Sequence, residues 1–104
     1  MDEAARELVL GWMTKARHDL ASARILGYGG DPVLDNAIYH CQQAAEKAVK
    51  GFLLCHGQSF GKTHDLEVLV ALAISIDAGF SRYQEAAIAL TPYATPVCNT
   101  IPLP

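Results

Sequence analysis

The stretch AIYHCQQAAEKAVKGFLLCHG, Ala37 to Gly57, decides the fold class of this chain. An α-helix turns about 100° per residue, so residues three or four positions apart share a face. On that geometry one arc of the stretch carries mostly small apolar side chains: Ala37, Cys41, Ala44, Ala45, Ala48, Gly51, Phe52 and Cys55. Because small side chains let a neighbouring helix approach closely, the pattern predicts a long helix that packs against other helices.

The opposite arc of this helix carries the polar side chains Tyr39, Gln42, Gln43, Glu46, Lys47 and Lys50. Glu46 and Lys50 stand four residues apart in the favourable order, which stabilises a helix by about 0.3–0.5 kcal/mol. Two interpretations stay open. The arc is a solvated face, or it holds an anionic ligand through Lys47 and Lys50, with Gln43 as a hydrogen-bonding partner.

Leu53 and Leu54 lie side by side near the C-terminal end of the polar arc. Adjacent leucines on an otherwise polar face are typical of a contact surface. We therefore expect both leucines to be exposed and to form the contact between two copies of the chain.

Three further helices accompany this one. Apolar stripes and turn signals predict helices over residues 3–26, 32–56, 64–77 and 81–90. Short links make neighbouring helices antiparallel, so the sequence predicts an all-α, antiparallel up-and-down four-helix bundle over residues 1–91. Four of the five prolines fall in the final stretch TPYATPVCNTIPLP, which predicts an irregular Pro-rich C-terminal tail over residues 92–104.

Three of the helix starts carry recognisable signals. Asp31 and Pro32 have the residue types of an N-cap and of a first helical position. Thr63 is a candidate cap for the third helix. Ser81 has the spacing of a capping box with Gln84, which predicts the start of the fourth helix.

Composition excludes several classes of protein. Of the 104 residues 51% are hydrophobic and 18% are charged, which excludes a disordered chain. The net charge of −3 provides no basic field of the kind that binds duplex DNA. The three cysteines cannot all pair, and no apolar run fits a signal peptide or a membrane span. We therefore expect a cytoplasmic protein that binds neither a membrane nor a DNA duplex.

The loop GQSFGKT, Gly57 to Thr63, resembles the end of a phosphate-binding P-loop. A P-loop needs four residues between its glycines and a strand before them, but here the glycines are closer and a helix precedes. Lys62, the Thr63 hydroxyl and the free amides at the next helix start remain candidate phosphate ligands. The histidines lack the spacing of a metal site, so we expect no metal and no cofactor.

Asp19 lies on the apolar stripe of the first predicted helix, where a carboxylate needs a partner. One interpretation is a structural acid that caps a backbone or pairs with a lysine or histidine of the bundle. The other is a functional acid that orients His64 or Lys47 in a polar pocket. The sequence leaves both interpretations open.

Three pieces of sequence, taken in order, resemble the HEPN domain of prokaryotic proteins. They are AxxDLxxA in Ala16 to Ala23, HCQQAAEKAVKGFL and KTHDLEVL, and their spacing matches over roughly residues 10–76. The resemblance implies a helical bundle that often forms dimers, often accompanies a minimal nucleotidyltransferase, and binds nucleotides or RNA. Some such proteins are metal-independent RNases with an Arg followed by four to six residues and a His. No arginine of this chain has a histidine at that distance.

These observations favour one function over two alternatives. The main hypothesis is a noncatalytic nucleotide- or RNA-binding module, a homodimer that partners a nucleotidyltransferase in a toxin–antitoxin-type or related system. Its expected ligand-binding residues are Gln43, Lys47, Lys50, Lys62 and His64, with Asp19 and Glu46 in support. The first alternative is an RNase toxin with a diverged site that uses His64 and Lys47. The second is a purely structural interaction subunit.

Overall fold

The computed structural model of the chain describes residues 1–94, and the remainder of the expected tail, residues 95–104, lies outside the described part. Residues 1–94 are all-α, with no strand. The elements are α1 (Glu3–Tyr28), α2 (Leu34–Cys55), α3 (Leu66–Ile76), η1 (Ala78–Tyr83), α4 (Gln84–Leu90) and η2 (Thr91–Tyr93), where η denotes a 3-10 helix. The predicted helical bundle is therefore confirmed. No helix within residues 1–94 combines the length and the hydrophobicity that crossing a bilayer requires.

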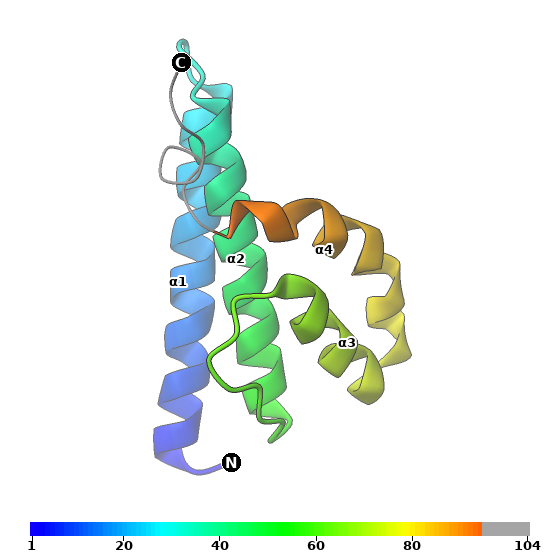
Figure 1. Cartoon of the computed structure of the whole chain (residues 1–104). Helices are drawn as coiled ribbons and strands as arrows, with labels where there is room; N and C mark the ends of the chain where they lie inside the picture. The colour runs from blue at the N-terminus through cyan, green and yellow to red at the C-terminus, as the bar shows by residue number, and fades with distance from the viewer. Residues whose placement is uncertain (95–104) are drawn as a thin grey trace.

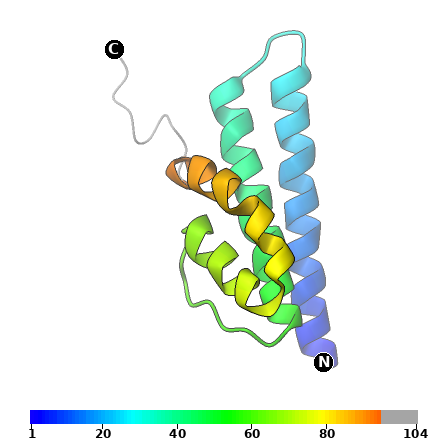
Figure 2. The ribbon, with the colours of Figure 1, turned by 90° about the vertical axis from the view of Figure 1, so that its right-hand side faces the viewer.

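The helices α1 and α2 form a long antiparallel hairpin, and they lie side by side in both views (Figures 1 and 2). Small buried residues line their contact, among them Ala16 and Ala23 on α1 and Ala37 and Gly51 on α2. A Cβ added at Gly51 would lie 3.4 Å from Cβ of Trp12 and 2.6 Å from Cε at the flexible end of Met13, so α1 and α2 are in close contact here. The small arc predicted from the sequence packs against α1 at these positions.

The hydrophobic core lies between α2 and the pair formed by α3 and α4. Its centre is Leu53 of α2 with Leu69 and Ala73 of α3, all 0% exposed. A second cluster joins α3 to α4 through Val70 and Ala87. The shorter helices therefore cover one side of α2, near its C-terminal half, as Figure 1 shows.

Leu53 and Leu54 differ in exposure, although they are neighbours in the sequence. The expectation that Leu53 is an exposed dimer contact is wrong, because α3 packs on this side of α2 and covers the side chain completely. Leu54 is half-buried, and its part in a dimer contact stays a prediction.

The starts of α2 and α3 differ from the sequence signals. The helix α2 begins beyond Asp31 and Pro32, and no side chain caps it. The cap of α3 is Asp65 rather than Thr63, since the Asp65 carboxylate accepts the backbone N–H of Glu67 at 3.0 Å. The Thr63 hydroxyl instead accepts the N–H of Asp65 at 3.0 Å. A carboxylate suits a helix N-terminus better than a hydroxyl, because it carries a full negative charge.

The fourth helix begins after a 3-10 turn, η1, which the sequence signals did not predict. Asp77 caps that turn by accepting the backbone N–H of Gly79 at 2.9 Å. Ser81 lies inside η1 and does not cap α4, which has no side-chain cap. The expected capping box at Ser81 is therefore wrong, because Asp77 starts the helical turn four residues earlier.

Candidate functional site

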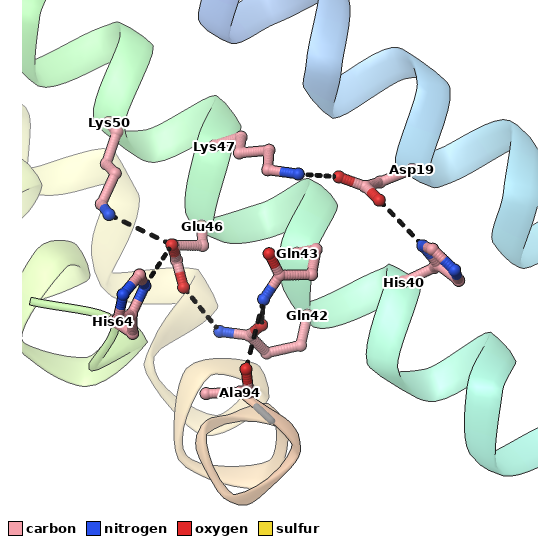
Figure 3. Close-up of polar contacts among 9 residues, drawn as sticks. All are labelled: Asp19, His40, Gln42, Gln43, Glu46, Lys47, Lys50, His64 and Ala94. Atoms are coloured by element: carbon pink, nitrogen blue, oxygen red, sulfur yellow. Dashed lines mark hydrogen bonds and ion pairs between the residues drawn. The ribbon is translucent and has the colours of Figure 1, made fainter. Parts of the chain in front are cut away.

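Two groups of polar side chains lie along α2, each centred on a carboxylate that a lysine and a histidine both contact (Figure 3). The Asp19 network consists of Asp19, His40 and Lys47. The Glu46 network consists of Gln42, Gln43, Glu46, Lys50, His64 and the carbonyl of Ala94.

The Glu46 network has a buried carboxylate with three hydrogen-bond donors. Lys50 Nζ donates to Glu46 Oε2 at 3.1 Å, and His64 Nδ1 lies 3.0 Å from the same oxygen. Gln42 Nε2 donates to the other oxygen, Oε1, at 3.2 Å. The side chains of Glu46 and Lys50 are only 3% and 5% exposed, so this ion pair lies inside the protein. A buried pair of this kind is tolerated only when additional hydrogen bonds satisfy its charges.

Two aromatic rings complete the surroundings of Lys50. Its Nζ lies 5.4 Å from the ring centroid of Trp12 on α1 and 5.5 Å from that of Phe60 in the loop before α3. Both distances are within the range of a cation–π interaction. The two rings also contact each other edge to face, with centroids 6.5 Å apart. Lys50 therefore ties three segments together: α1, α2 and the loop.

The two glutamines extend the Glu46 network toward η2. Gln43 Nε2 donates to Gln42 Oε1 at 2.7 Å and to the carbonyl of Ala94 at 3.4 Å. Gln42 is 0% exposed, and no buried side-chain nitrogen or oxygen within residues 1–94 lacks a partner. Four members of the polar arc, Gln42, Gln43, Glu46 and Lys50, thus belong to one internal network with its hydrogen bonds satisfied, and Gln42 takes part in it as fully as Glu46.

The carboxylate of Glu46 remains ionised at neutral pH although it is buried. Burial by itself would raise the pKa of Glu46. Hydrogen bonds from His64, Gln42 and Lys50, together with the charge of Lys50, outweigh burial and hold the pKa of Glu46 below its ordinary value.

The Asp19 network joins α1 to α2 on the other part of the hairpin contact. Lys47 Nζ donates to Asp19 Oδ2, and His40 Nδ1 lies 2.8 Å from Asp19 Oδ1. Burial would raise the pKa of Asp19, but the hydrogen bonds and charges of Lys47 and His40 lower it below its ordinary value. The prediction that Asp19 pairs with a bundle lysine or histidine is confirmed. The alternative that Asp19 orients His64 or Lys47 agrees with the structure only for the contact with Lys47, because Glu46 holds the His64 imidazole.

The predicted ligand-binding residues fall into exposed and covered groups. Lys62 is exposed, and the His64 side chain is 71% exposed although Glu46 holds its Nδ1. Lys47 is 21% exposed, and Gln43 is half-buried. Lys50, a predicted ligand contact, does not present its ammonium group at the surface, because Glu46 and the two aromatic rings enclose it. The structure brings Lys50 and His64 together on Glu46, and it brings Lys47 to Asp19 instead.

A family model for the HEPN domain matches residues 9–99 of the chain. This chain belongs to the HEPN family. It matched no curated protein and no solved structure in the corresponding comparisons. HEPN domains are commonly dimeric and are often associated with nucleotidyltransferases and with RNA binding or cleavage.

The three pieces of sequence that resemble HEPN domains supply both networks. AxxDLxxA contributes Asp19, the stretch from His40 to Leu53 contributes the members on α2, and KTHDLEVL contributes His64. Only the carbonyl of Ala94 comes from outside them. In this HEPN chain the pieces therefore share a structural task, which is to join α1, α2 and the loop before α3 by buried polar contacts.

Sequence reasoning missed two side chains of these networks, His40 and Gln42. His40 lies at the edge between the two arcs of α2, where spacing alone gives no signal. For Gln42 a signal exists, because Gln42, Glu46 and Lys50 recur at intervals of four residues and the same row continues to the fully buried Leu53. A polar row that leads into a core leucine indicates burial rather than solvation.

Proposed function

We propose that this HEPN chain is a noncatalytic binding module that holds the phosphate groups of a nucleotide or an RNA, as a dimer that partners a nucleotidyltransferase. The observation that carries the proposal is the state of His64. Its Nδ1 is fixed by the buried Glu46 at 3.0 Å, yet its side chain is 71% exposed. A ring held in this way offers its second nitrogen, Nε2, to a ligand at the surface.

Lys62 extends this candidate site along the same loop. It is exposed, and it forms no ion pair within the described residues. Gly57 and Gly61 both have positive φ, 70° and 67°, so the loop makes two turns that other residues adopt poorly before it reaches Lys62. A lysine and an imidazole two residues apart on such a loop suit the oxygens of a phosphate group.

The remaining predicted residues contribute less directly to ligand binding. Glu46 and Lys50 neutralise each other inside the protein, so they position His64 rather than contact a ligand. Lys47 is shared with Asp19 and remains partly exposed, as a secondary contact for an extended ligand. Gln43 donates to Gln42 and Ala94, which leaves it a supporting role.

Two observations favour binding over RNA cleavage. The chain lacks an arginine followed at four to six residues by a histidine. The acid–base pair considered as an alternative, His64 with Lys47, does not share a partner, since His64 contacts Glu46 whereas Lys47 contacts Asp19.

Calorimetric titration with ATP, GTP and a short single-stranded RNA tests the proposal, with the protein alone and with a candidate nucleotidyltransferase. The double variant Lys62→Ala/His64→Ala is expected to weaken binding by about tenfold or more and to reduce its salt dependence. The matched control is His18→Ala, which removes an exposed histidine of α1 outside both networks. Absence of heat in every combination would remove ligand binding from the account, and cleavage of the RNA would favour the RNase alternative.

A further inference from the structure

A groove of about 400 Å³ runs between α1 and α2 near the turn that joins them. This end of the hairpin extends beyond α3 and α4, as both ribbon views show (Figures 1 and 2). Its two ridges are Leu20, Arg24 and Tyr28 on α1, and Leu34, Ile38 and Cys41 on α2. Neither the Asp19 network nor the Glu46 network includes any of these residues.

Small residues form the floor of the groove and set its depth. Ala23 and Ala37 are only 6% and 7% exposed, and they lie between the two ridges. A Cβ added at Gly27 would lie 3.6 Å from Cβ of Ala37, so the two helices are in close contact here. The larger ridge side chains lie on either side of this floor, and the space between them is the valley of the groove.

The ridges are apolar and unusually exposed. Leu34 is 62% exposed, Leu20 is 41% exposed and Ile38 is 36% exposed, and Tyr28 at the end of the α1 ridge is 89% exposed. Single exposed leucines are common on proteins, but four large apolar side chains around one groove are typical of an interaction surface.

One positive charge stands in this apolar surface. Arg24 lies on the α1 ridge between Leu20 and Tyr28, one helical turn from each. It forms no ion pair within residues 1–94, and the aspartates near the turn, Asp31 and Asp35, form none with it. A complementary occupant would therefore bring apolar side chains for the valley and a carboxylate for Arg24.

We propose that this groove binds one amphipathic helix of a partner protein, with an aliphatic stripe in the valley and an acidic side chain against Arg24. Along the two ridges the residues repeat at intervals of three and four. Side chains at this spacing form rows, and the side chains of a second helix pack between such rows. From Leu20 to Tyr28 the ridge spans about 12 Å, or two turns of such a helix. The proposal does not depend on Lys62 or His64.

Another occupant, single-stranded nucleic acid, fits the groove less well. Single-stranded nucleic acid binds through rows of aromatic rings, whereas this groove has one ring, Tyr28, and is otherwise aliphatic apart from Arg24 and Cys41.

Fluorescence anisotropy with a labelled model helix tests the proposal. The probe is a synthetic helical peptide with a leucine stripe flanked by glutamates, and its counterpart carries lysines in place of the glutamates. The glutamate peptide is expected to bind the wild type better. Arg24→Glu should weaken that binding about tenfold and should strengthen binding of the lysine peptide. Ile38→Asp should weaken the binding of both peptides.

The matched control is Ile25→Asp, because Ile25 is 74% exposed on the same helix but does not line the groove. It should leave binding unchanged, and circular dichroism should show the same helix content in all variants. Equal binding of both peptides by wild type and Arg24→Glu would overturn the proposal. A short RNA that binds in place of the peptides, and whose binding is lost in Arg24→Glu, would also overturn it. A third contradictory result would be a dimer in sedimentation equilibrium that Ile38→Asp converts to a monomer.

Discussion

His64 Nδ1 lies 3.0 Å from Glu46 Oε2, and this contact joins two residues 18 positions apart in the chain. One partner is almost entirely buried, with a side-chain exposure of 3%, while the other is 71% exposed. The contact therefore links the interior of the bundle to its surface. It fixes the imidazole that the proposed ligand site uses, and it holds the loop before α3 against α2.

The first prediction concerns the buried charge of Lys50. Glu46→Gln keeps the size and hydrogen-bonding shape of the side chain but leaves the Lys50 ammonium, 5% exposed, without a counter-charge. We expect the free energy of unfolding to fall by about 3 kcal/mol, measured by urea denaturation at neutral pH. The exposed control Glu85→Gln should change it by about 0.5 kcal/mol or less. A similar small effect in both variants would mean that the buried pair does not stabilise the fold.

The second prediction separates the charge from its position. Adding Lys50→Met to Glu46→Gln removes the unpaired ammonium while an unbranched apolar chain still packs against Trp12 and Phe60. The double variant should therefore recover at least half of the stability that Glu46→Gln loses, as a double-mutant cycle would show. Additive losses in that cycle would contradict the pairing of Glu46 with Lys50.

The third prediction is a loss of stability in acid. The pKa values of Asp19 and Glu46 are both lowered in the folded protein, so both groups stabilise the fold above their unfolded pKa values, about 4. That stability is lost as the pH falls from there through the lowered folded pKa values. Urea midpoints should therefore drop steeply below about pH 4.5 in the wild type.

Two variants test the origin of this acid sensitivity. Asp19→Asn and Glu46→Gln should each be less stable than the wild type at neutral pH and should each show a shallower decline in acid. Each lacks one of the two carboxylates that must take up a proton. An unchanged slope in both variants would assign the acid sensitivity to other groups.

Much of the fold was predictable because it depends on local spacing. The small arc that includes Ala37 and Gly51 indicated close helix packing, and these two residues are buried against α1. Asp19 was a second clear signal, since a carboxylate on an apolar stripe requires a partner, and Lys47 and His40 provide it. The polar character of one helix face, however, did not reveal whether solvent or protein covers it.

The burial of Glu46 and Lys50 depends on segments that are distant in sequence. His64, Trp12 and Phe60 come from different parts of the chain and meet these two residues only in the folded bundle. The burial of Leu53 likewise depends on a distant segment. Its position beside the polar arc predicted exposure, but α3 packs over it in the folded bundle. Spacing within α2 therefore predicted the pairing of Glu46 with Lys50 but not its burial.

The fourth prediction tests the corrected position of Leu53. Leu53→Ala should lower the free energy of unfolding by about 3 kcal/mol, because the side chain is 0% exposed and its removal leaves a cavity beside Leu69. The oligomeric state in sedimentation experiments should stay the same. A change from dimer to monomer without loss of stability would instead restore Leu53 as a dimer contact.

The fifth prediction is that a phosphate-bearing ligand binds at the imidazole that Glu46 anchors. Amide chemical shifts of isotope-labelled protein are followed by NMR while a short single-stranded RNA is added. We expect the largest shifts at Lys62, Thr63 and His64, and we expect them to be lost in Glu46→Gln under conditions where that variant is folded. Shifts confined to α1 around Arg24, or no shifts at all, would contradict it.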